Sequence, residues 1–285
     1  MNGSWRYAFA SVTGASHRER HLPCQDASAC TLVPGAVGTS ALVAVIADGA
    51  GSTVHGGDGA QLACTLFIES ARAALKGAAS THDLPWDFVP TWLDRFQTAV
   101  AKQAEHSATS PRDFSCTLLA AIIHVEDAAF LQVGDGAIVL AGPGSPDYFR
   151  LFTWPQTGEY ENTTRFATDP SAADRACIEI VEMPIDEVTL LSDGLQRLAL
   201  DYTARVAFQP FFGPLLSPLR AAPEGHAAQL SLALERFLGS PTVNNRTDDD
   251  KSLILASRRA LEATAPSGDS ENHGDHGHTP VRRAG

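Results

Sequence analysis

The sequence lacks the features that mark membrane-spanning, secreted and nucleic-acid-binding proteins. No apolar run approaches the roughly 18 residues of a membrane helix, and the N-terminus has no basic region followed by an apolar stretch, so no signal peptide is predicted. The five cysteines include no CxxC pair, which disfavours a zinc site or a disulfide framework. We therefore expect a soluble cytoplasmic protein that does not bind membranes.

Charge and missing motifs narrow the function further. The net charge of −12 over 285 residues argues against a nucleic-acid partner, which would need clustered Lys and Arg to neutralise phosphates. The chain also contains no P-loop, no GxSxG, no HExxH and no dinucleotide fingerprint. An acidic protein can still bind phosphorylated groups where metal ions supply local positive charge.

Short apolar runs joined by short connections fill the middle of the chain. Strands are predicted at 41–47, four times within 114–153, twice within 177–192, and at 252–257. Connections as short as "EDA" and "GDG" are typical of antiparallel neighbours. Helices are expected at 59–74, 86–106 and 226–238, the last after a Pro/Phe-rich connection.

Strand-rich and helix-rich blocks follow one another, which indicates an α+β protein with a mainly antiparallel sheet. No repeat or linker divides the body, so one domain is expected over residues 1–262. Residues 263–285 are polar and without periodicity, which is typical of a disordered tail. That tail contains His273, His276 and His278.

Acidic residues recur at the ends of the predicted strands or in adjoining turns: Asp26, Asp48, Asp135, Asp193 and Asp249. Mg²⁺ and Mn²⁺ prefer oxygen ligands and keep several waters, so a few carboxylates suffice. Gly49 lets the backbone approach closely, so its carbonyl is a candidate ligand. Two such ions about 4 Å apart can polarise a bridging water into hydroxide and neutralise a phosphoryl group.

Each of these segments also has an ordinary structural interpretation. Asp-Gly is common in hairpin turns, so "VGDGAIV" by itself fits a plain hairpin. The run "TDDDKS" fits a helix cap or a solvated acidic loop. Spacing alone does not make the five carboxylates converge, and both interpretations stay open on the residues themselves.

Six segments, taken in order, resemble the metal-dependent protein phosphatases of the protein phosphatase 2C type. They span residues 14–256: "GASHRERHLPCQDAS", "VAVIADGAGST", "SCTLLAAII", "LQVGDGAIVL", "TLLSDGLQRL" and "DDDKSLILA". The CQDA form of the first motif occurs in a bacterial branch of that family. The resemblance implies a four-layer α-β-β-α sandwich of two antiparallel sheets flanked by helices, with metals at the cleft between the sheets.

The resemblance also implies a role for each aspartate. Asp48, with the Gly49 carbonyl, Asp193 and Asp249 match the residues that hold two Mn²⁺ or Mg²⁺ ions, and Asp48, Asp193 and Asp26 match catalytic positions. Asp135 matches the residue associated with a weaker third ion, and Asp26 supports the metal site. Within the run of three aspartates, Asp249 matches best and its two neighbours, Asp248 and Asp250, are rivals for the same role.

The chain departs from the family pattern in the first motif. Gln25 stands where the family often has Glu, and His21 stands where many members place a phosphate-binding Arg. Arg18, Arg20 and His17 are further candidates for phosphate binding, and an ordinary surface role competes with each of the four. Gly136 replaces the usual Ser of the third motif. These changes concern phosphate positioning more than metal binding.

We therefore expect a Mg²⁺- or Mn²⁺-dependent phosphatase that hydrolyses phosphoserine or phosphothreonine with a metal-bridging hydroxide. Its partner would be a phosphorylated protein, a cognate Ser/Thr kinase or that kinase's target. Two alternatives remain: a degenerate phosphatase fold acting as a regulatory binding module, and a dimetal hydrolase of small phosphate esters. Residues 154–176 lie where the family has a variable flap, and a plain surface loop is the competing interpretation.

Overall fold

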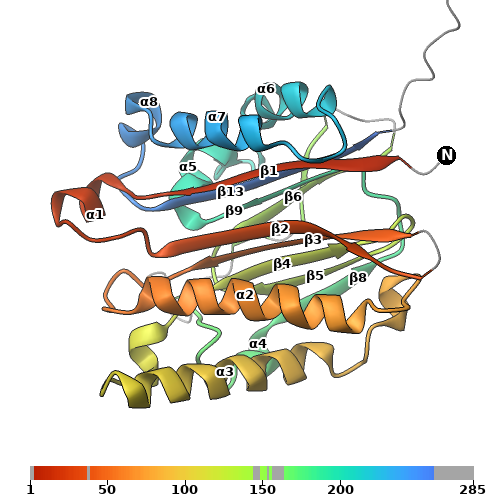
Figure 1. Ribbon diagram of the computed structural model, residues 1–285. Coiled ribbons are helices and arrows are strands. Elements are labelled where there is room, and N and C mark those ends of the chain that lie inside the picture. The colour runs from red at the N-terminus through yellow and green to blue at the C-terminus, as the bar shows by residue number, and fades with distance from the viewer. Residues whose placement is uncertain (1–2, 37–38, 144–147, 153, 156–163, 260–285) are drawn as a thin grey trace, which may run out of the picture.

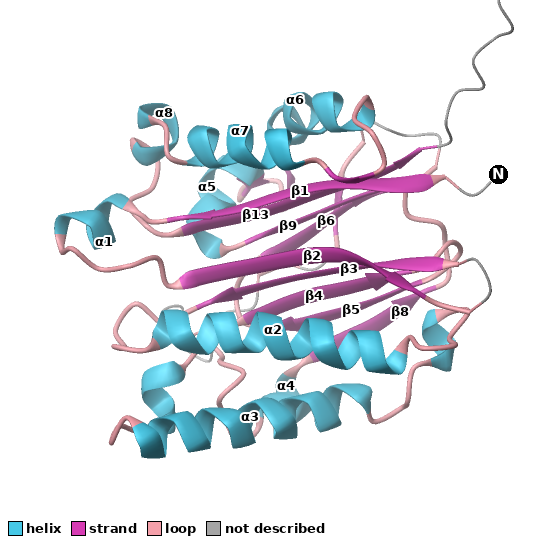
Figure 2. Ribbon diagram, viewed as in Figure 1, coloured by secondary structure: helices cyan, strands magenta, loops and turns pink. Residues whose placement is uncertain are grey.

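The computed structural model describes residues 3–36, 39–143, 148–152, 154–155 and 164–259. Two β-sheets stack face to face, and each carries helices on its outer face (Figures 1 and 2). The expected four-layer α-β-β-α architecture is therefore confirmed. The predicted tail at 263–285 lies outside the described residues.

One layer is a six-stranded sheet covered by helices near the C-terminal end of the body. Its strands, in spatial order, are β12 (Gly225–His226), β1 (Ser4–Val12), β13 (Lys251–Arg259), β9 (Glu187–Leu191), β6 (Ala137–Ala141) and β7 (Arg150–Leu151). All neighbours are antiparallel except the short β1–β12 pair, which is parallel. The helices of this layer are α6 (Gln209–Arg220), α7 (Ala228–Leu238) and α8 (Pro241–Asn244).

The other layer is a five-stranded antiparallel sheet under two long helices. The strand order is β2 (Asp26–Pro34), β3 (Ser40–Asp48), β4 (Leu118–Ile123), β5 (Ala128–Val133) and β8 (Cys177–Val181). The long helices are α2 (Gly56–Ala74) and α3 (Phe88–His106). The smaller elements are α1 (Ala15–Glu19), α4 (Ala172–Arg175), α5 (Gln196–Ala199), the β10–β11 ribbon (Leu200–Asp201 and Val206–Ala207), and 3₁₀ turns at Thr81–Asp83, Pro111–Phe114 and Asp193–Leu195.

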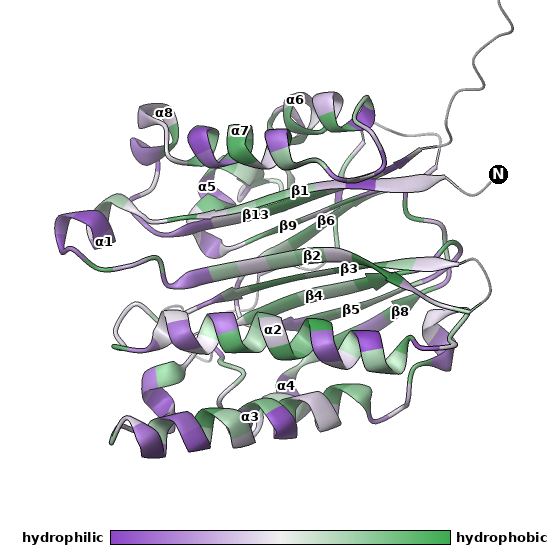
Figure 3. Cartoon of the chain, in the orientation of Figure 1, coloured by the Kyte–Doolittle hydropathy of each residue, from purple (hydrophilic) through white to green (hydrophobic). Residues whose placement is uncertain are grey.

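The core forms three apolar layers between these four structural layers. One lies between α2, α3 and the five-stranded sheet, one between the two sheets, and one between the six-stranded sheet and its helices. Because both faces of the central strands are covered, β3 and β4 are almost continuously apolar instead of alternating. Figure 3 shows this as apolar colour along those strands, whereas the helices carry both apolar and polar colour.

The structure corrects the expectation that "GDG" joins antiparallel neighbours. β5 and β6, on either side of Gly134-Asp135-Gly136, belong to different sheets. Gly134 adopts a positive φ of 103°, a conformation that glycine tolerates at low cost. This tight turn carries the chain from one layer to the other and leaves Asp135 at the end of the sandwich.

The Pro/Phe-rich segment before α7 is also not the expected connection, since it forms helix α6. Phe212, Leu216 and Leu219 recur at helical spacing and are buried against the sheet. Three prolines four residues apart, Pro210, Pro214 and Pro218, are all exposed. Burial of the apolar stripe outweighs the hydrogen bonds that the two inner prolines remove.

The remaining predicted elements occur near their expected positions, but two N-terminal strands were not anticipated. β1 pairs along its whole length with β13, and β2 pairs along its whole length with β3. Among the described residues, no helix is long and apolar enough to cross a membrane.

Candidate active site

The candidate aspartates gather at one end of the sandwich, the left end in Figure 1. Asp26 begins β2, and Asp48 ends β3. Asp135 follows β5, Asp193 follows β9, and Asp249 precedes β13. Antiparallel pairing brings these strand ends together, so residues that are far apart in sequence lie at the same end of both sheets.

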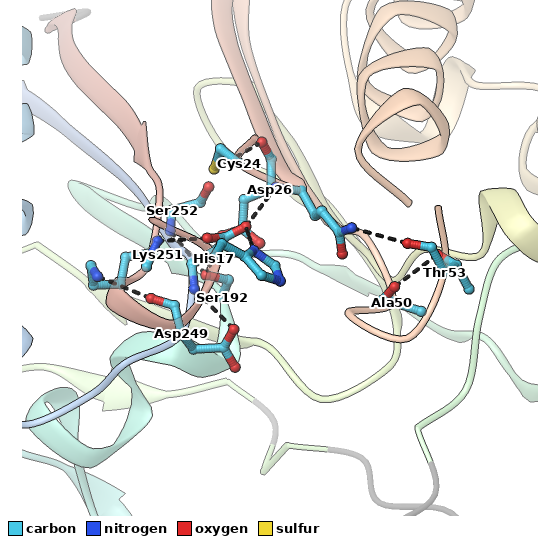
Figure 4. A network of polar contacts seen from close by, with 12 residues as sticks. His17, Cys24, Asp26, Ala50, Thr53, Ser192, Asp249, Lys251 and Ser252 are labelled. Atoms are coloured by element: carbon cyan, nitrogen blue, oxygen red, sulfur yellow. Dashed lines mark hydrogen bonds and ion pairs between the residues drawn. The ribbon is translucent and has the colours of Figure 1, made fainter. Parts of the chain in front are cut away.

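Asp26 and Asp48 occupy directly opposed positions in the β2–β3 pair. The Ser192 hydroxyl donates a 2.7 Å hydrogen bond to Asp26 Oδ2. The same hydroxyl accepts a bond from the Ser252 amide at 2.9 Å. Ser192 therefore ties Asp26 of one sheet to β13 of the other (Figure 4).

The backbone after Asp48 is held on both sides. The Gly49 amide donates to the Gln25 carbonyl at 3.0 Å, and the Thr117 amide donates to the Asp48 carbonyl at 2.8 Å. A side chain at Gly49 would place its Cβ 2.3 Å from the Gly56 carbonyl carbon. Only glycine fits this close approach, which fixes the Asp48-Gly49 peptide against the first motif.

Burial and mutual repulsion raise the pKa values of the clustered carboxylates. Burial, with added charge from Asp193, raises the pKa of Asp26 to about 7. Burial, followed by the charges of Asp26 and Asp193, raises the pKa of Asp48 well above its usual range. Burial also raises the pKa of Asp193 to about 6, with contributions from the charges of Asp135 and Asp249. The carboxylates thus act on one another as one electrostatic cluster.

The donor set fits hard, hydrated divalent cations. Asp26 Oδ1 and Asp193 Oδ1 are buried without any hydrogen-bond partner, an unfavourable arrangement unless a ligand satisfies them. Within the described ranges, no three His, Cys, Asp or Glu side chains form a group that could hold a metal by themselves. Mg²⁺ and Mn²⁺ do not require such a group, because they retain several waters and bind through one or two carboxylates each.

The three consecutive aspartates at 248–250 have distinct surroundings. Asp250 is 2 % exposed and accepts hydrogen bonds from the Gly14 amide at 2.6 Å, the Gln25 amide at 2.5 Å and His17 Nδ1 at 2.9 Å. Asp248 is exposed, and its carbonyl accepts the Ser16 amide at 2.9 Å. Asp250 is therefore a structural anchor for the first motif.

Asp248 and Asp249 are both exposed, and Asp249 is the one whose charge acts on Asp48 and Asp193. Its side chain is exposed, and one oxygen accepts the Asp250 amide at 2.9 Å. Its carbonyl accepts the ammonium of Lys251 at 2.9 Å, which also donates to Asn244 Oδ1 at 3.1 Å. Lys251 is fully buried, so its ammonium group holds the Asp249 backbone from the interior of the protein.

The four candidates for phosphate binding lie on or beside α1, at the same end of the molecule. Arg18, Arg20 and His21 are exposed. His17 is buried, and its Nδ1 is committed to Asp250. α1 is anchored to the Asp248 carbonyl through Ser16, so it lies at the same end of the sandwich as the carboxylate cluster.

Asp135 contacts the stretch at 154–176, of which residues 156–163 lie outside the described part. Thr164 donates its hydroxyl to Asp135 Oδ2 at 2.8 Å. Burial raises the pKa of Asp135, and this hydrogen bond opposes the shift. Thr164, in the described part of this stretch, therefore contacts the third motif directly.

Sequence reasoning missed several residues that hold the site. Ser192 directly precedes the Asp193-Gly194 pair, and that adjacency was the available signal. Thr117 accepts the Asp48 amide through its hydroxyl at 3.1 Å, and no local pattern announces this contact. Lys251 looks like a solvent-exposed charge in the sequence but is buried.

A mostly apolar cavity of about 280 Å³ opens elsewhere, between the start of α3 and the outer face of β8. Its lining includes Trp86, Phe88, Ile178 and Ile180, and none of the candidate site residues. The residues that line this cavity include no carboxylate. The carboxylate end is therefore the candidate metal site, and this cavity is separate from it.

Comparisons with known proteins agree with this geometry. The chain is 36% identical over 256 residues to serine/threonine-protein phosphatase 3 of Escherichia coli (strain K12), covering 89% of this chain and 98% of that protein. Its fold is similar to PppA of Pseudomonas aeruginosa, described as a key regulatory component of T6SS (TM-score 0.61, 17% identity, 90% of this chain and 99% of that one). It is also similar to the serine/threonine phosphatase Stp1 of Staphylococcus aureus (TM-score 0.59, 15% identity, 89% and 95%). The family profile described as protein phosphatase 2C matches residues 13–238. The chain belongs to the protein phosphatase 2C family.

Proposed function

We propose that this chain is a Mg²⁺- or Mn²⁺-dependent phosphatase that removes phosphate from phosphoserine and phosphothreonine in cytoplasmic proteins. The observation that carries the proposal is the cluster at the end of the sandwich, with unpartnered buried oxygens on Asp26 and Asp193. The family and the relative's name as a serine/threonine-protein phosphatase support the same reaction class.

In this proposal Asp48, the Gly49 carbonyl, Asp193 and Asp249 hold two ions, and Asp135 holds a weaker third. When bound, the ions would supply Lewis acidity, an activated water and neutralisation of the phosphoryl charge. The chain's own contribution is positioning. Its carboxylates are set before substrate arrives, and such preorganisation carries most of the rate in phosphoryl transfer.

Asp26 acts as a positioning residue in this scheme. One of its oxygens is fixed by Ser192, and the other is buried without a hydrogen-bond partner. Gln25 cannot supply the second carboxylate of the family's first motif. Its side-chain amide instead donates to the Thr53 carbonyl at 3.0 Å, which holds the loop after Gly49.

The phosphoryl group would be received by basic residues of α1. Arg18 and Arg20 are exposed and able to pair with phosphate oxygens. His21 has the left-handed backbone conformation, with φ of 55°, which marks the sharp end of α1. The physiological partner in this proposal is a Ser/Thr kinase or one of its phosphorylated targets.

The deciding experiment compares three substrates with Mn²⁺ and with a chelator: a phosphothreonine peptide, p-nitrophenyl phosphate and a free nucleotide. We expect Mn²⁺-dependent turnover of the peptide at the highest kcat/KM. Faster turnover of the nucleotide would favour a hydrolase of small phosphate esters. Peptide binding without turnover of any substrate would favour the regulatory module.

A further inference from the structure

A second hollow, of about 610 Å³, lies next to the carboxylate end. Its walls come from α5, the β10–β11 ribbon, the start of α6 and the residues around α8. The lining combines two guanidinium groups, Arg197 and Arg246, with the aromatic side chains of Tyr202, Phe208 and Phe211. This volume is large enough for one or two peptide side chains.

The two arginines are close neighbours in sequence of two candidate metal ligands. Arg197 follows Asp193 by four residues, across a 3₁₀ turn and the start of α5, and both residues lie close enough to Tyr202 in the wall of the hollow to interact with it electrostatically. Arg246 precedes Asp249 by three residues, and three Cα steps span at most about 11 Å. The hollow therefore lies close to Asp193 and Asp135 of the carboxylate cluster.

A chain of hydrogen bonds connects the wall of the hollow to the third motif. The Tyr202 hydroxyl donates to Gln196 Oε1 at 2.7 Å. The Gln196 amide in turn donates to the Asp135 carbonyl. These hydrogen bonds fix the position of the wall relative to the third motif. A ligand bound in the hollow would therefore be held in a defined position relative to the carboxylate cluster.

The charge of the hollow is unusual for this chain. The protein as a whole has a net charge of −12, yet this wall presents two exposed arginines. In the part of the chain that the structure describes, neither guanidinium has an ion pair or a hydrogen bond. The one acidic residue in the lining, Asp201, accepts the amides of Thr203 and Ala204 at 2.9 Å each.

We propose that this hollow is a substrate subsite that binds an anionic side chain of the phosphoprotein near the phosphorylated residue. Guanidinium groups pair with carboxylate and phosphate through two parallel hydrogen bonds, and the aromatic walls cover the apolar part of the same segment. An extended chain advances about 3.3 Å per residue, so an anion two to four positions from the phosphorylated residue lies about 7–13 Å from it, which is the range in which we place the hollow. This inference rests on the proposed function and names its substrate class.

The test uses three phosphothreonine peptides that are identical except for one residue, which lies two to four positions from the phosphothreonine. At that position the peptides carry Glu, Lys or a second phosphothreonine. The proteins are the wild-type chain, the double variant Arg197→Gln/Arg246→Gln, and the control Arg236→Gln, an exposed arginine on α7. We expect wild type and control to prefer the Glu or doubly phosphorylated peptide over the Lys peptide at least tenfold in kcat/KM. The double variant should reduce this ratio to about one, chiefly through KM.

A binding measurement keeps the subsite and the catalytic proposal separable. Peptides with a phosphonate analogue of phosphothreonine are titrated by fluorescence anisotropy in the presence of Mn²⁺. An anion preference that only the double variant loses supports the subsite, even without turnover, and the better-bound peptide identifies carboxylate or phosphate. Equal binding of the Glu and Lys peptides by wild type, or a preference that survives in the double variant, overturns it.

Discussion

Asp26 and Asp48 face each other as direct partners across the β2–β3 pair, with both carboxyl groups at the end of the sandwich. Like charges at opposed positions of a strand pair are destabilising. Burial adds to the penalty, because it raises the pKa of each group. The folded protein therefore contains unfavourable repulsion between buried carboxylates, which bound cations would neutralise.

The metal-free protein should lose stability as the pH rises. A group whose folded pKa lies above its unfolded value stabilises the fold below the unfolded pKa, and this contribution disappears as the pH passes the folded pKa. Asp26, with a pKa of about 7, and Asp193, with about 6, set a window from about pH 4 to pH 7. We expect the free energy of unfolding to fall by several kcal/mol across it, with an upper limit of about 7 kcal/mol if the two groups titrate independently, at about 1.4 kcal/mol for each step of one in pKa.

Urea unfolding in a chelator at a series of pH values measures this effect. Asp26→Asn removes one titrating carboxyl and should flatten the pH dependence. Added Mn²⁺ should restore stability at neutral pH, since a ligand that binds only the folded state stabilises it. A metal-free stability that rises with pH throughout this window, equally in both proteins, would contradict the account.

Two neighbouring aspartates should respond in opposite ways to the same substitution. Asp250→Ala leaves the buried amides of Gly14 and Gln25 without an acceptor, which should destabilise the fold by about 2–4 kcal/mol. Asp249→Ala removes an exposed carboxylate and should change stability by less than about 1 kcal/mol. It should instead weaken Mn²⁺ dependence and turnover.

Thermal unfolding in a chelator and a Mn²⁺ titration of activity separate the two aspartates. If Asp250→Ala proved neutral for stability while Asp249→Ala unfolded the chain, the assignment of anchor and ligand would be reversed.

The glycine of the Ser-Asp-Gly motif should not tolerate a methyl group. A Cβ at Gly194 would lie 2.0 Å from the Asp250 carbonyl oxygen, so Gly194→Ala must displace the backbone of β13 or of the motif. We expect a loss of about 1–3 kcal/mol. A Cβ at Gly213 in α6 would meet nothing within 4 Å, and Gly213→Ala should stabilise by about 0.5–1 kcal/mol. Chemical denaturation of both variants provides the comparison, and similar effects would refute the close-packing argument.

Most of the fold could be predicted from the sequence, because local apolar patterns mark most of its strands and helices. An apolar run that ends in Asp-Gly marks a buried strand and its exit, and this placed Asp48 and Asp193 at strand ends. The connection at Asp135 was misjudged, because a three-residue link looks the same whether it joins neighbours or crosses between sheets. The segment that forms α6 was predicted as a connection because of its prolines. It is a helix because burial of Phe212 and Leu216 outweighs the low helix propensity of proline.

The site was less predictable than the fold. Three consecutive aspartates carry similar local signals, and contacts with Gly14, His17 and Gln25, more than 200 residues away, distinguish Asp250 from Asp249. The subsite arginines gave no signal either, since Arg197 and Arg246 are isolated charges in the sequence. Their proximity follows from the folding of α5 and α8 around one hollow.

The central claim is that these aspartates hold catalytic metal ions, and one measurement tests it most directly. Phosphate release from a phosphothreonine peptide is followed against Mn²⁺ concentration for wild type, Asp48→Asn, Asp193→Asn and the control Asp94→Asn, an exposed aspartate on α3. Calorimetric Mn²⁺ titration of the same four proteins accompanies it. We predict Mn²⁺-dependent turnover that falls at least a hundredfold in both site variants and stays unchanged in the control. Turnover that persists in a chelator, or survives in Asp48→Asn and Asp193→Asn, would contradict the claim.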